Sequence, residues 1–224
     1  MSARRLALLF AGVFLLALAA LLPLGVALRA ASLPASLRYV AAEGSLWNGR
    51  LAEVQLGSFE LGDVDADLAA LPLALGRIRL DLRAAHLRWR LLGGDARGVE
   101  HADGALPLDL PGGTGAATLH LEDVALVFAD GGCRRAGGRV ALDLALGDTL
   151  PPQRLEGVPA CSGERGDLVL AGDGGVPLEA RLEVAADGRA ILRMTSGIET
   201  PALIAAGFTP GPAGASLVRE GRLF

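Results

Sequence analysis

Alternation of apolar and polar side chains at period two runs through most of the chain after Arg38. Residues 77–83 place Ile78, Leu80 and Leu82 on one face and charged side chains on the other. This alternation is typical of a β-strand with one buried and one solvated face. It recurs at residues 52–56, 64–68, 86–91, 106–110, 117–121, 140–144, 178–184 and 190–194. The pattern predicts about a dozen short strands.

Clusters rich in glycine, aspartate and proline separate these strands. Glycine in such clusters supplies the positive φ that tight turns need. The clusters lie at residues 93–95, 111–113, 130–132, 172–175 and 186–188. Residues 77–83 and 86–91 are joined by two alanines, and they are the clearest hairpin signal in the chain. No helical pattern connects the strands, so we expect a mainly β fold with a mostly antiparallel sheet.

The apolar face of such a sheet has to be covered. A sandwich or a barrel covers it with the sheet itself, whereas an open curled sheet needs a helix, an apolar ligand or a partner. All three forms fit the pattern. Residues 201–207 are helical in pattern, with Thr200 as the expected N-cap and Gly207 as the expected end, and they are too few to cover a large sheet. We predict one β-rich domain over residues 29–224.

The N-terminal segment predicts a membrane helix. Residues 6–28 carry no charge and are bounded by Arg4, Arg5 and Arg29. At about 1.5 Å rise per residue, a helix of this length crosses the roughly 30 Å hydrocarbon core of a bilayer. A cleaved signal peptide is the alternative, but its apolar region usually has about 7–15 residues. We favour a single retained transmembrane helix, in which Pro23 is tolerated.

The basic residues before this helix predict its orientation. Residues 1–5, with Arg4 and Arg5, form a stub short enough to stay on the cytoplasmic side. Residues 29–224 then lie outside the cytoplasm. We therefore expect a single-pass protein of a bacterial inner membrane with its C-terminal domain in the periplasm.

Cys133 and Cys161 are the two cysteines of the chain, and both lie in the exported portion. We predict a disulfide between them, because exported proteins meet an oxidising compartment. Two free buried thiols, or half of a metal site, are the alternatives. A metal site is disfavoured because the spacing is not that of a CxxC element and no histidine lies near either cysteine in sequence. The bridge would contribute on the order of 3 kcal/mol to stability.

Composition argues against several function classes. The formal net charge is −4, with 21 Lys plus Arg against 25 Asp plus Glu, so the basic footprint of a nucleic-acid-binding protein is missing. The three histidines are scattered: His86 and His120 at solvated strand positions and His101 in an expected loop. Common catalytic and phosphate-binding motifs are absent from the sequence. We expect no enzyme, no catalytic or metal residues and no cofactor.

One short segment combines turn residues with a large aromatic side chain. In residues 44–50, Gly44 and Gly49 bracket Leu46 and Trp47 just before the first predicted strand. Trp47 either caps the core of the sheet, with the glycines allowing tight bends, or forms a docking surface, because tryptophan is favoured at the centre of interfaces.

Residues 44–50 resemble the Gly-x-Leu/Val-Trp-x-Gly element of the type II secretion system protein N family. The basic stub, the apolar segment and the β-rich remainder are similar to that family, as are the glycine-rich stretches after Cys133 and Cys161. Residues 64–75 depart from it, because a second tryptophan is expected there and none is present.

This resemblance implies an inner-membrane component of the machine that exports folded proteins across the outer membrane. It would act through contacts with other secretion-system subunits, and the family offers no catalytic residues to carry over. The short repeated strands also resemble AsmA-like periplasmic bridge proteins. The alternative function is therefore binding or transfer of lipid or another apolar ligand.

Overall fold

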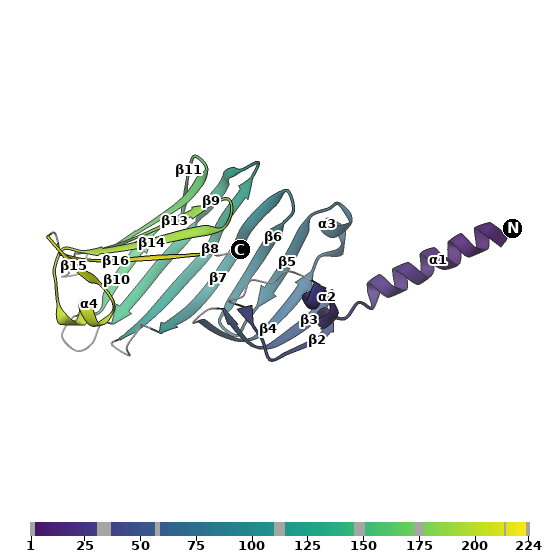
Figure 1. Cartoon of the computed structure of the whole chain (residues 1–224), viewed down its shortest axis with the longest axis horizontal. Helices are drawn as coiled ribbons and strands as arrows, with labels where there is room; N and C mark the ends of the chain where they lie inside the picture. The colour runs from purple at the N-terminus through teal and green to yellow at the C-terminus, as the bar shows by residue number, and fades with distance from the viewer. Residues whose placement is uncertain are drawn as a thin grey trace.

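One antiparallel sheet of 16 strands makes up the body of the molecule (Figure 1). The computed structural model describes residues 3–30, 37–56, 59–109, 115–145, 151–172, 177–212 and 214–222. Its elements are α1 (Ala3–Ala20), α2 (Leu24–Ala30), β1 (Leu37–Arg38), β2 (Ala41–Ser45), β3 (Asn48–Leu56), β4 (Phe59–Leu68), α3 (Ala70–Ala74), β5 (Ile78–Arg83), β6 (Leu87–Gly93), β7 (Ala96–Asp109), β8 (Ala116–Ala129), β9 (Gly132–Ala145), β10 (Gln153–Gly157), β11 (Ala160–Ser162), β12 (Arg165–Ala171), β13 (Leu178–Ala185), β14 (Arg189–Ser196), α4 (Pro201–Ala205), β15 (Thr209–Gly211) and β16 (Gly214–Arg222). Consecutive strands are neighbours from β3 to β10, and the order continues through β12, β13, β14 and β16.

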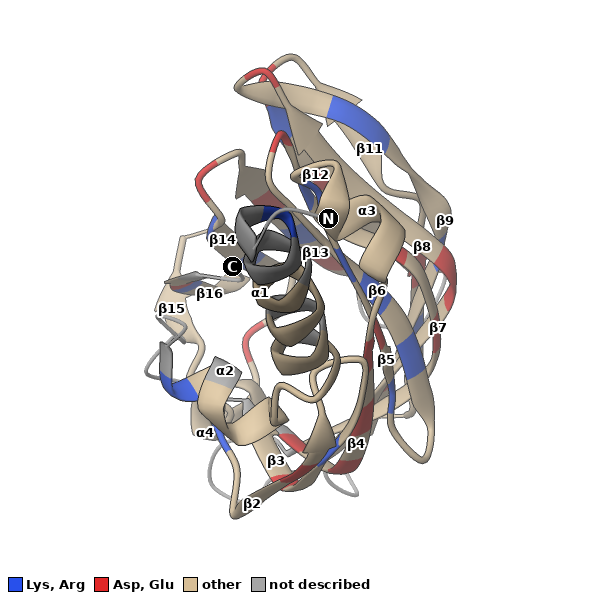
Figure 2. Ribbon diagram, turned by 90° about the vertical axis from the view of Figure 1, so that its right-hand side faces the viewer, with Lys and Arg blue, Asp and Glu red and all other residues tan. Residues whose placement is uncertain are grey.

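The two ends of this sheet stay apart. β1 and β15 stand at opposite ends of the strand order, and no pairing joins them in the described ranges. Figures 1 and 2 show the sheet curling along its length, so that its later strands turn back over the earlier ones. Of the three forms that the pattern allowed, the chain adopts the open curled sheet. The prediction of a mainly antiparallel β fold is confirmed.

The sheet bends at bulges that the alternation does not reveal. The predicted hairpin is present as β5 and β6, with Leu82 opposite Trp89. His101, expected in a loop, lies instead in β7 at a register shift against β6, with a φ of 49°. Asp123 takes a φ of 46° at a similar shift between β8 and β9. Bulges bend strands and increase their twist, so these positions favour the curl.

Apolar side chains line the inner face of the curl in two large clusters. The cluster nearer the N-terminus contains Leu51 and Val64 of the sheet and Leu24 of α2. The second cluster joins side chains from β8 through β16, among them Leu142 and Leu155. Side chains from strands as far apart as β8 and β16 meet in the second cluster. The inner face of the curl is therefore the buried face of the sheet.

Helix α4 covers the far end of this inner face. The helix predicted at residues 201–207 is present, and the N-cap is confirmed because the backbone N–H of Leu203 donates to Thr200 Oγ1 at 3.3 Å. Leu203 is fully buried in the second cluster, where Phe208 also packs. As its short length predicted, the helix covers one end of the inner face and not the rest of it.

The N-terminal helix differs from the continuous one expected over residues 6–28. It is divided into α1 and α2, with the break at residues 21–23. Pro23 explains the break, because proline has no N–H to donate and disfavours helical geometry in the residue before it. In the part of the chain that is described, no helix has both the length and the apolar content needed to cross a bilayer. The membrane span stays a prediction.

Candidate docking site at the helix and hairpin junction

The predicted glycine and tryptophan element forms the β2–β3 hairpin. Gly44 lies opposite Gly49, and Ser45 lies opposite Asn48. The chain reverses at Leu46 and Trp47, and the backbone N–H of Asn48 donates to Ser45 Oγ at 3.3 Å. Trp47 is therefore half-buried at the tip of a hairpin, where it can meet a partner.

Both glycines are required by the geometry of this hairpin. Gly44 has a φ of +78°, and a Cβ on it would lie 2.6 Å from the carbonyl oxygen of Asn48. A Cβ on Gly49 would lie 2.8 Å from the carbonyl oxygen of Ser45 and 2.5 Å from Cδ2 of Leu24. A side chain at either position collides with backbone, so the spacing of these glycines specifies the tight turn.

The chain around the start of α2 packs against this hairpin and is hydrogen-bonded to it. Leu24 is 3% exposed and packs in the N-terminal apolar cluster. The backbone N–H of Leu46 donates to the carbonyl oxygen of Leu22 at 2.9 Å, and Pro23 forms a bridge with Ser45. The end of the predicted membrane segment is thus bound to the turn that carries Trp47.

An ion pair holds the other side of the hairpin. Arg50 Nη2 lies 2.7 Å from Asp63 Oδ2, and the backbone N–H of Glu53, at a bulge in β3, donates to Asp63 Oδ1 at 3.2 Å. The hydrogen bond from Arg50 and then that from Glu53 hold the pKa of the Asp63 carboxyl below its ordinary value. The same hydrogen bond raises the pKa of Arg50. The ion pair links β3 to β4 on the exposed face of the sheet.

The arginines that flank the predicted span lie at the two ends of the helical segment. Arg4 and Arg5 fall in the first turns of α1, and Arg29 is exposed in the last turn of α2. A basic side chain at a helix C-terminus interacts favourably with the helix dipole.

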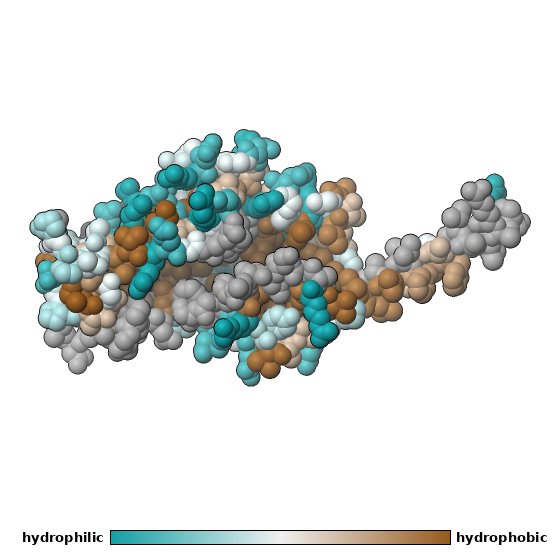
Figure 3. Space-filling view, in the orientation of Figure 1, coloured by the Kyte–Doolittle hydropathy of each residue, from teal (hydrophilic) through white to brown (hydrophobic). Residues whose placement is uncertain are grey.

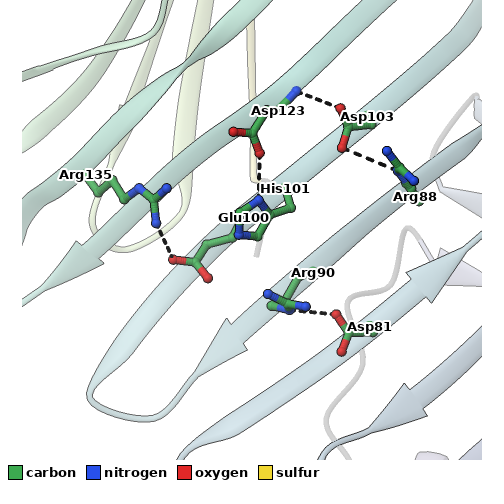
Figure 4. Close-up of polar contacts among 8 residues, drawn as sticks. All are labelled: Asp81, Arg88, Arg90, Glu100, His101, Asp103, Asp123 and Arg135. Carbon is green, nitrogen blue, oxygen red and sulfur yellow. Dashed lines mark hydrogen bonds and ion pairs between the residues drawn. The ribbon is translucent and has the colours of Figure 1, made fainter.

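A second polar constellation crosses β5 to β9 on the outer face (Figure 4). His101 Nδ1 lies 2.6 Å from Asp123 Oδ1, and the backbone N–H of Asp123 donates to Asp103 Oδ1 at 2.8 Å. Asp103 Oδ2 also lies 3.4 Å from Arg88 Nε. Arg90 with Asp81 and Arg135 with Glu100 complete the set.

This constellation has a structural explanation. Each carboxylate in it has an arginine, histidine or backbone N–H partner, and Asp103 satisfies the amide freed by the bulge at Asp123. Among the described residues, no group of three side chains is suited to hold a metal ion. Sequence reasoning missed the pairing of His101 with Asp123, because it depends on where two bulges fall.

Cys133 and Cys161 form the predicted disulfide, with their Cα atoms 5.4 Å apart. Cys133 lies at the start of β9, and Cys161 lies in β11, which pairs with β12. The bridge therefore ties the β11–β12 hairpin to a strand from an earlier part of the sheet.

Replacing both cysteines by serine is expected to lower the free energy of unfolding by about 3 kcal/mol, since the bridge restricts the unfolded chain. Denaturant unfolding of the intact chain, with and without a reducing agent, measures this loss. The reducing agent should destabilise the native protein and leave the double variant unchanged. Equal stability of the two proteins under oxidising conditions would show that the bridge contributes nothing.

The family model described as type II secretion system (T2SS), protein N matches residues 35–207. The chain belongs to this family. The resemblance seen in residues 44–50 is therefore confirmed, and the matched range contains the hairpin, both cysteines and α4.

A relative within this family comes from Vibrio cholerae serotype O1 (strain ATCC 39315 / El Tor Inaba N16961) and is named Type II secretion system protein N. It is 38% identical over 76 residues, which are 34% of this chain. The aligned part spans 30% of the length of that relative. No solved structure matches the chain.

Proposed function

We propose that this chain is an inner-membrane-anchored periplasmic component of the type II secretion system. It supports export of folded proteins across the outer membrane through contacts with other subunits, without catalysis. Its membership of the protein N family supports a place in this system. The disulfide is compatible with the oxidising periplasm. Of the predicted span, the part in α1 would anchor the chain, because Leu24 and Leu28 of α2 pack in the N-terminal apolar cluster of the domain. Residues 1–5 would lie in the cytoplasm and residues 29–224 in the periplasm.

The observation that carries this proposal is the position of Trp47. It stands at the tip of a hairpin whose glycines hold the turn tight and whose turn is bound to the chain at the start of α2. A half-buried tryptophan on a rigid turn presents a large contact area at low entropic cost, as at interface hot spots. We infer that Trp47 and the exposed Gly44 form the surface that another secretion subunit contacts, whereas Leu46, which packs against the N-terminal cluster, and the buried Gly49 hold the turn in place.

The Trp47→Ala variant tests this assignment. We expect it to lower secretion of a substrate protein at least tenfold, because losing an interface hot spot costs about 2 kcal/mol or more of binding free energy. The stability of the domain should change by less than about 1.5 kcal/mol, since Trp47 lies at a turn and not among the buried residues of the core. Secretion in cells and denaturant unfolding of the purified chain give the two readouts.

Trp89→Ala is the matched control. Trp89 packs against the N-terminal apolar cluster on the inner face, so its loss should reduce stability by about 2–4 kcal/mol. If Trp47→Ala unfolds the domain as strongly as Trp89→Ala does, Trp47 is a core residue and the docking assignment is wrong. Normal secretion by a folded Trp47→Ala variant contradicts it as well.

A second candidate function is binding of a lipid or another apolar ligand on the inner face of the curl. Around the two clusters this face carries aliphatic side chains that are only half-buried: Leu91 packs against the N-terminal cluster, and Leu121, Leu168 and Leu192 pack against the second. The ion pairs lie on the other face of the same strands, as Arg90 with Asp81 does. Figure 3 shows hydrophobic surface within the hollow of this side of the molecule. An open apolar face of this kind fits hydrocarbon chains.

A further inference from the structure

The connection between β4 and β5 exposes a cluster of leucines. Residues 68–76 carry no charge, and they include α3, which has no buried residue. Leu71 is 76% exposed and Leu75 is 69% exposed, with Leu73 and Ile78 also exposed beside them. We call Leu71, Leu73 and Leu75 the leucine turn. Exposed apolar side chains gathered in one place mark a contact surface.

The leucine turn and the β2–β3 turn, which carries Leu46 and Trp47, differ from the other turns on this edge of the sheet. Because the strands are antiparallel, the turns after β6, β8, β11 and β13 lie on the same edge as α3. Each of those turns carries glycine and an acidic residue, namely Asp95, Asp130, Glu164 and Asp187. The acidic turns present charged side chains to water, whereas the leucine turn presents apolar side chains. The apolar composition of the leucine turn therefore indicates a role specific to this position in the fold.

The backbone of the leucine turn is well ordered by hydrogen bonds. The N–H of Ala69 donates to the carbonyl oxygen of Arg79 at 2.9 Å, and the N–H of Arg77 donates to that of Pro72 at 2.9 Å. Gly76 closes the turn with a φ of +75°. The leucines are thus held outward by a fixed backbone. Arg77, which follows them, is exposed.

The leucine turn lies at the end of the domain from which α1 projects. Figure 1 shows α3 and α2 at the same end of the sheet, and Figure 2, viewed from that end, shows α3 facing the viewer with α1. If α1 enters a bilayer, this end of the domain faces the bilayer surface. Apolar side chains followed by an arginine are suited to that surface, since leucine enters the acyl boundary and arginine pairs with anionic headgroups.

We propose that the leucine turn is a second membrane contact, which inserts into the interfacial region of the bilayer that α1 enters. This inference rests on the proposed anchoring of α1. With two contacts, one at α1 and one at α3, the sheet would be held at a fixed tilt, with the end of its apolar inner face that lies near α2 directed at the bilayer.

Depth-dependent fluorescence quenching tests this contact on the full chain. A small fluorescent amino acid is placed at Leu71 in one protein, at Phe14 of α1 in a second and at Val158 in a third. Val158 is the control, since it is an exposed apolar residue between β10 and β11, part-way along the sheet and away from its turns: the preceding Gly157 lies opposite Val140 in the middle of β9. The proteins are reconstituted into vesicles of phosphatidylethanolamine and phosphatidylglycerol whose acyl chains are brominated.

We expect the probe at Leu71 to lose most of its fluorescence, the probe at Phe14 to be quenched as well, and the probe at Val158 to keep its fluorescence. Changing Leu73 and Leu75 to serine in the Leu71 protein should restore much of the signal. Quenching at Phe14 without quenching at Leu71 overturns the membrane contact and leaves the anchor intact. Absence of quenching at both positions contradicts the anchor and, with it, this proposal.

If the Leu71 probe stays unquenched in vesicles, a photoreactive residue at Leu71 in cells shows whether protein covers the turn. Adducts to a protein would then assign the leucine turn to a subunit interface and overturn the lipid contact.

Discussion

Leu24→Ala is expected to release α2 from the β2–β3 hairpin. Leu24 is 3% exposed and fills the space left by the missing side chain of Gly49. Removing a buried leucine side chain beyond Cβ costs about 2–5 kcal/mol. Near the lower end of this range, the amides of β2 and β3 should exchange hydrogen roughly 30-fold faster, since each 1.4 kcal/mol is about tenfold.

Hydrogen exchange of the intact chain, resolved by mass spectrometry, measures this release. Val26→Ala is the matched control, because Val26 lies in the same helix and is 53% exposed. We expect the control to leave exchange in β2 and β3 unchanged. Similar exchange in both variants would mean that α2 is not held by Leu24. The link between the predicted anchor and the hairpin would then be lost.

Leu203→Ala is expected to destabilise the other end of the sheet. Leu203 is 1% exposed and joins α4 to side chains of β8 to β16 in the larger apolar cluster. Its truncation leaves a cavity where α4 covers the inner face, so the free energy of unfolding should fall by about 3–5 kcal/mol. Denaturant unfolding measures the loss.

The neighbouring Ile204 provides the control for α4. It is 39% exposed in the same short helix, so Ile204→Ala should cost less than about 1 kcal/mol. A cost for Leu203→Ala as small as that of the control would show that α4 does not hold the inner face of the curl closed. The apolar face would then lack its cover at this end.

The strands could be predicted from the sequence because their signal is local. Alternation around Leu80 and Leu82 identified β5, and the two alanines after it identified the hairpin with β6. The open, curled form depends on pairings between distant strands and on bulges such as those at His101 and Asp123. A bulge moves the side chains that follow it to the opposite face of the strand without any change in amino-acid composition. For this reason His101, which lies in β7, was wrongly predicted to lie in a loop.

The candidate site was predicted in part. The spacing of Gly44 and Gly49 around Trp47 indicated a tight turn, and the structure explains both glycines by close backbone approach. The contact of Gly49 with Leu24 was not predicted, because Leu24 lies in a run of similar apolar residues with nothing to distinguish it. The helix α3 was missed for a related reason, since a single helical turn is too short to show a period.

The N-terminal helices and the sheet are linked through the β2–β3 hairpin. The hairpin that holds Trp47 is bound to α2, and its strand β3 is the first long strand of the sheet. A subunit docked on the hairpin would therefore contact both the end of the predicted anchor and the N-terminal end of the apolar inner face. Protein contacts and a ligand on the inner face are compatible in this arrangement.

Photo-crosslinking in cells tests the central claim most directly. A photoreactive amino acid replaces Trp47 in one protein and Arg88 in another, and the adducts are identified by mass spectrometry. Arg88 is the control, because it is exposed on the outer face of β6 away from the hairpin. The proposed function predicts adducts to other subunits of the secretion system from position 47 and not from position 88. Adducts from position 47 to lipid alone, with no protein partner, would contradict it and favour the lipid-binding function.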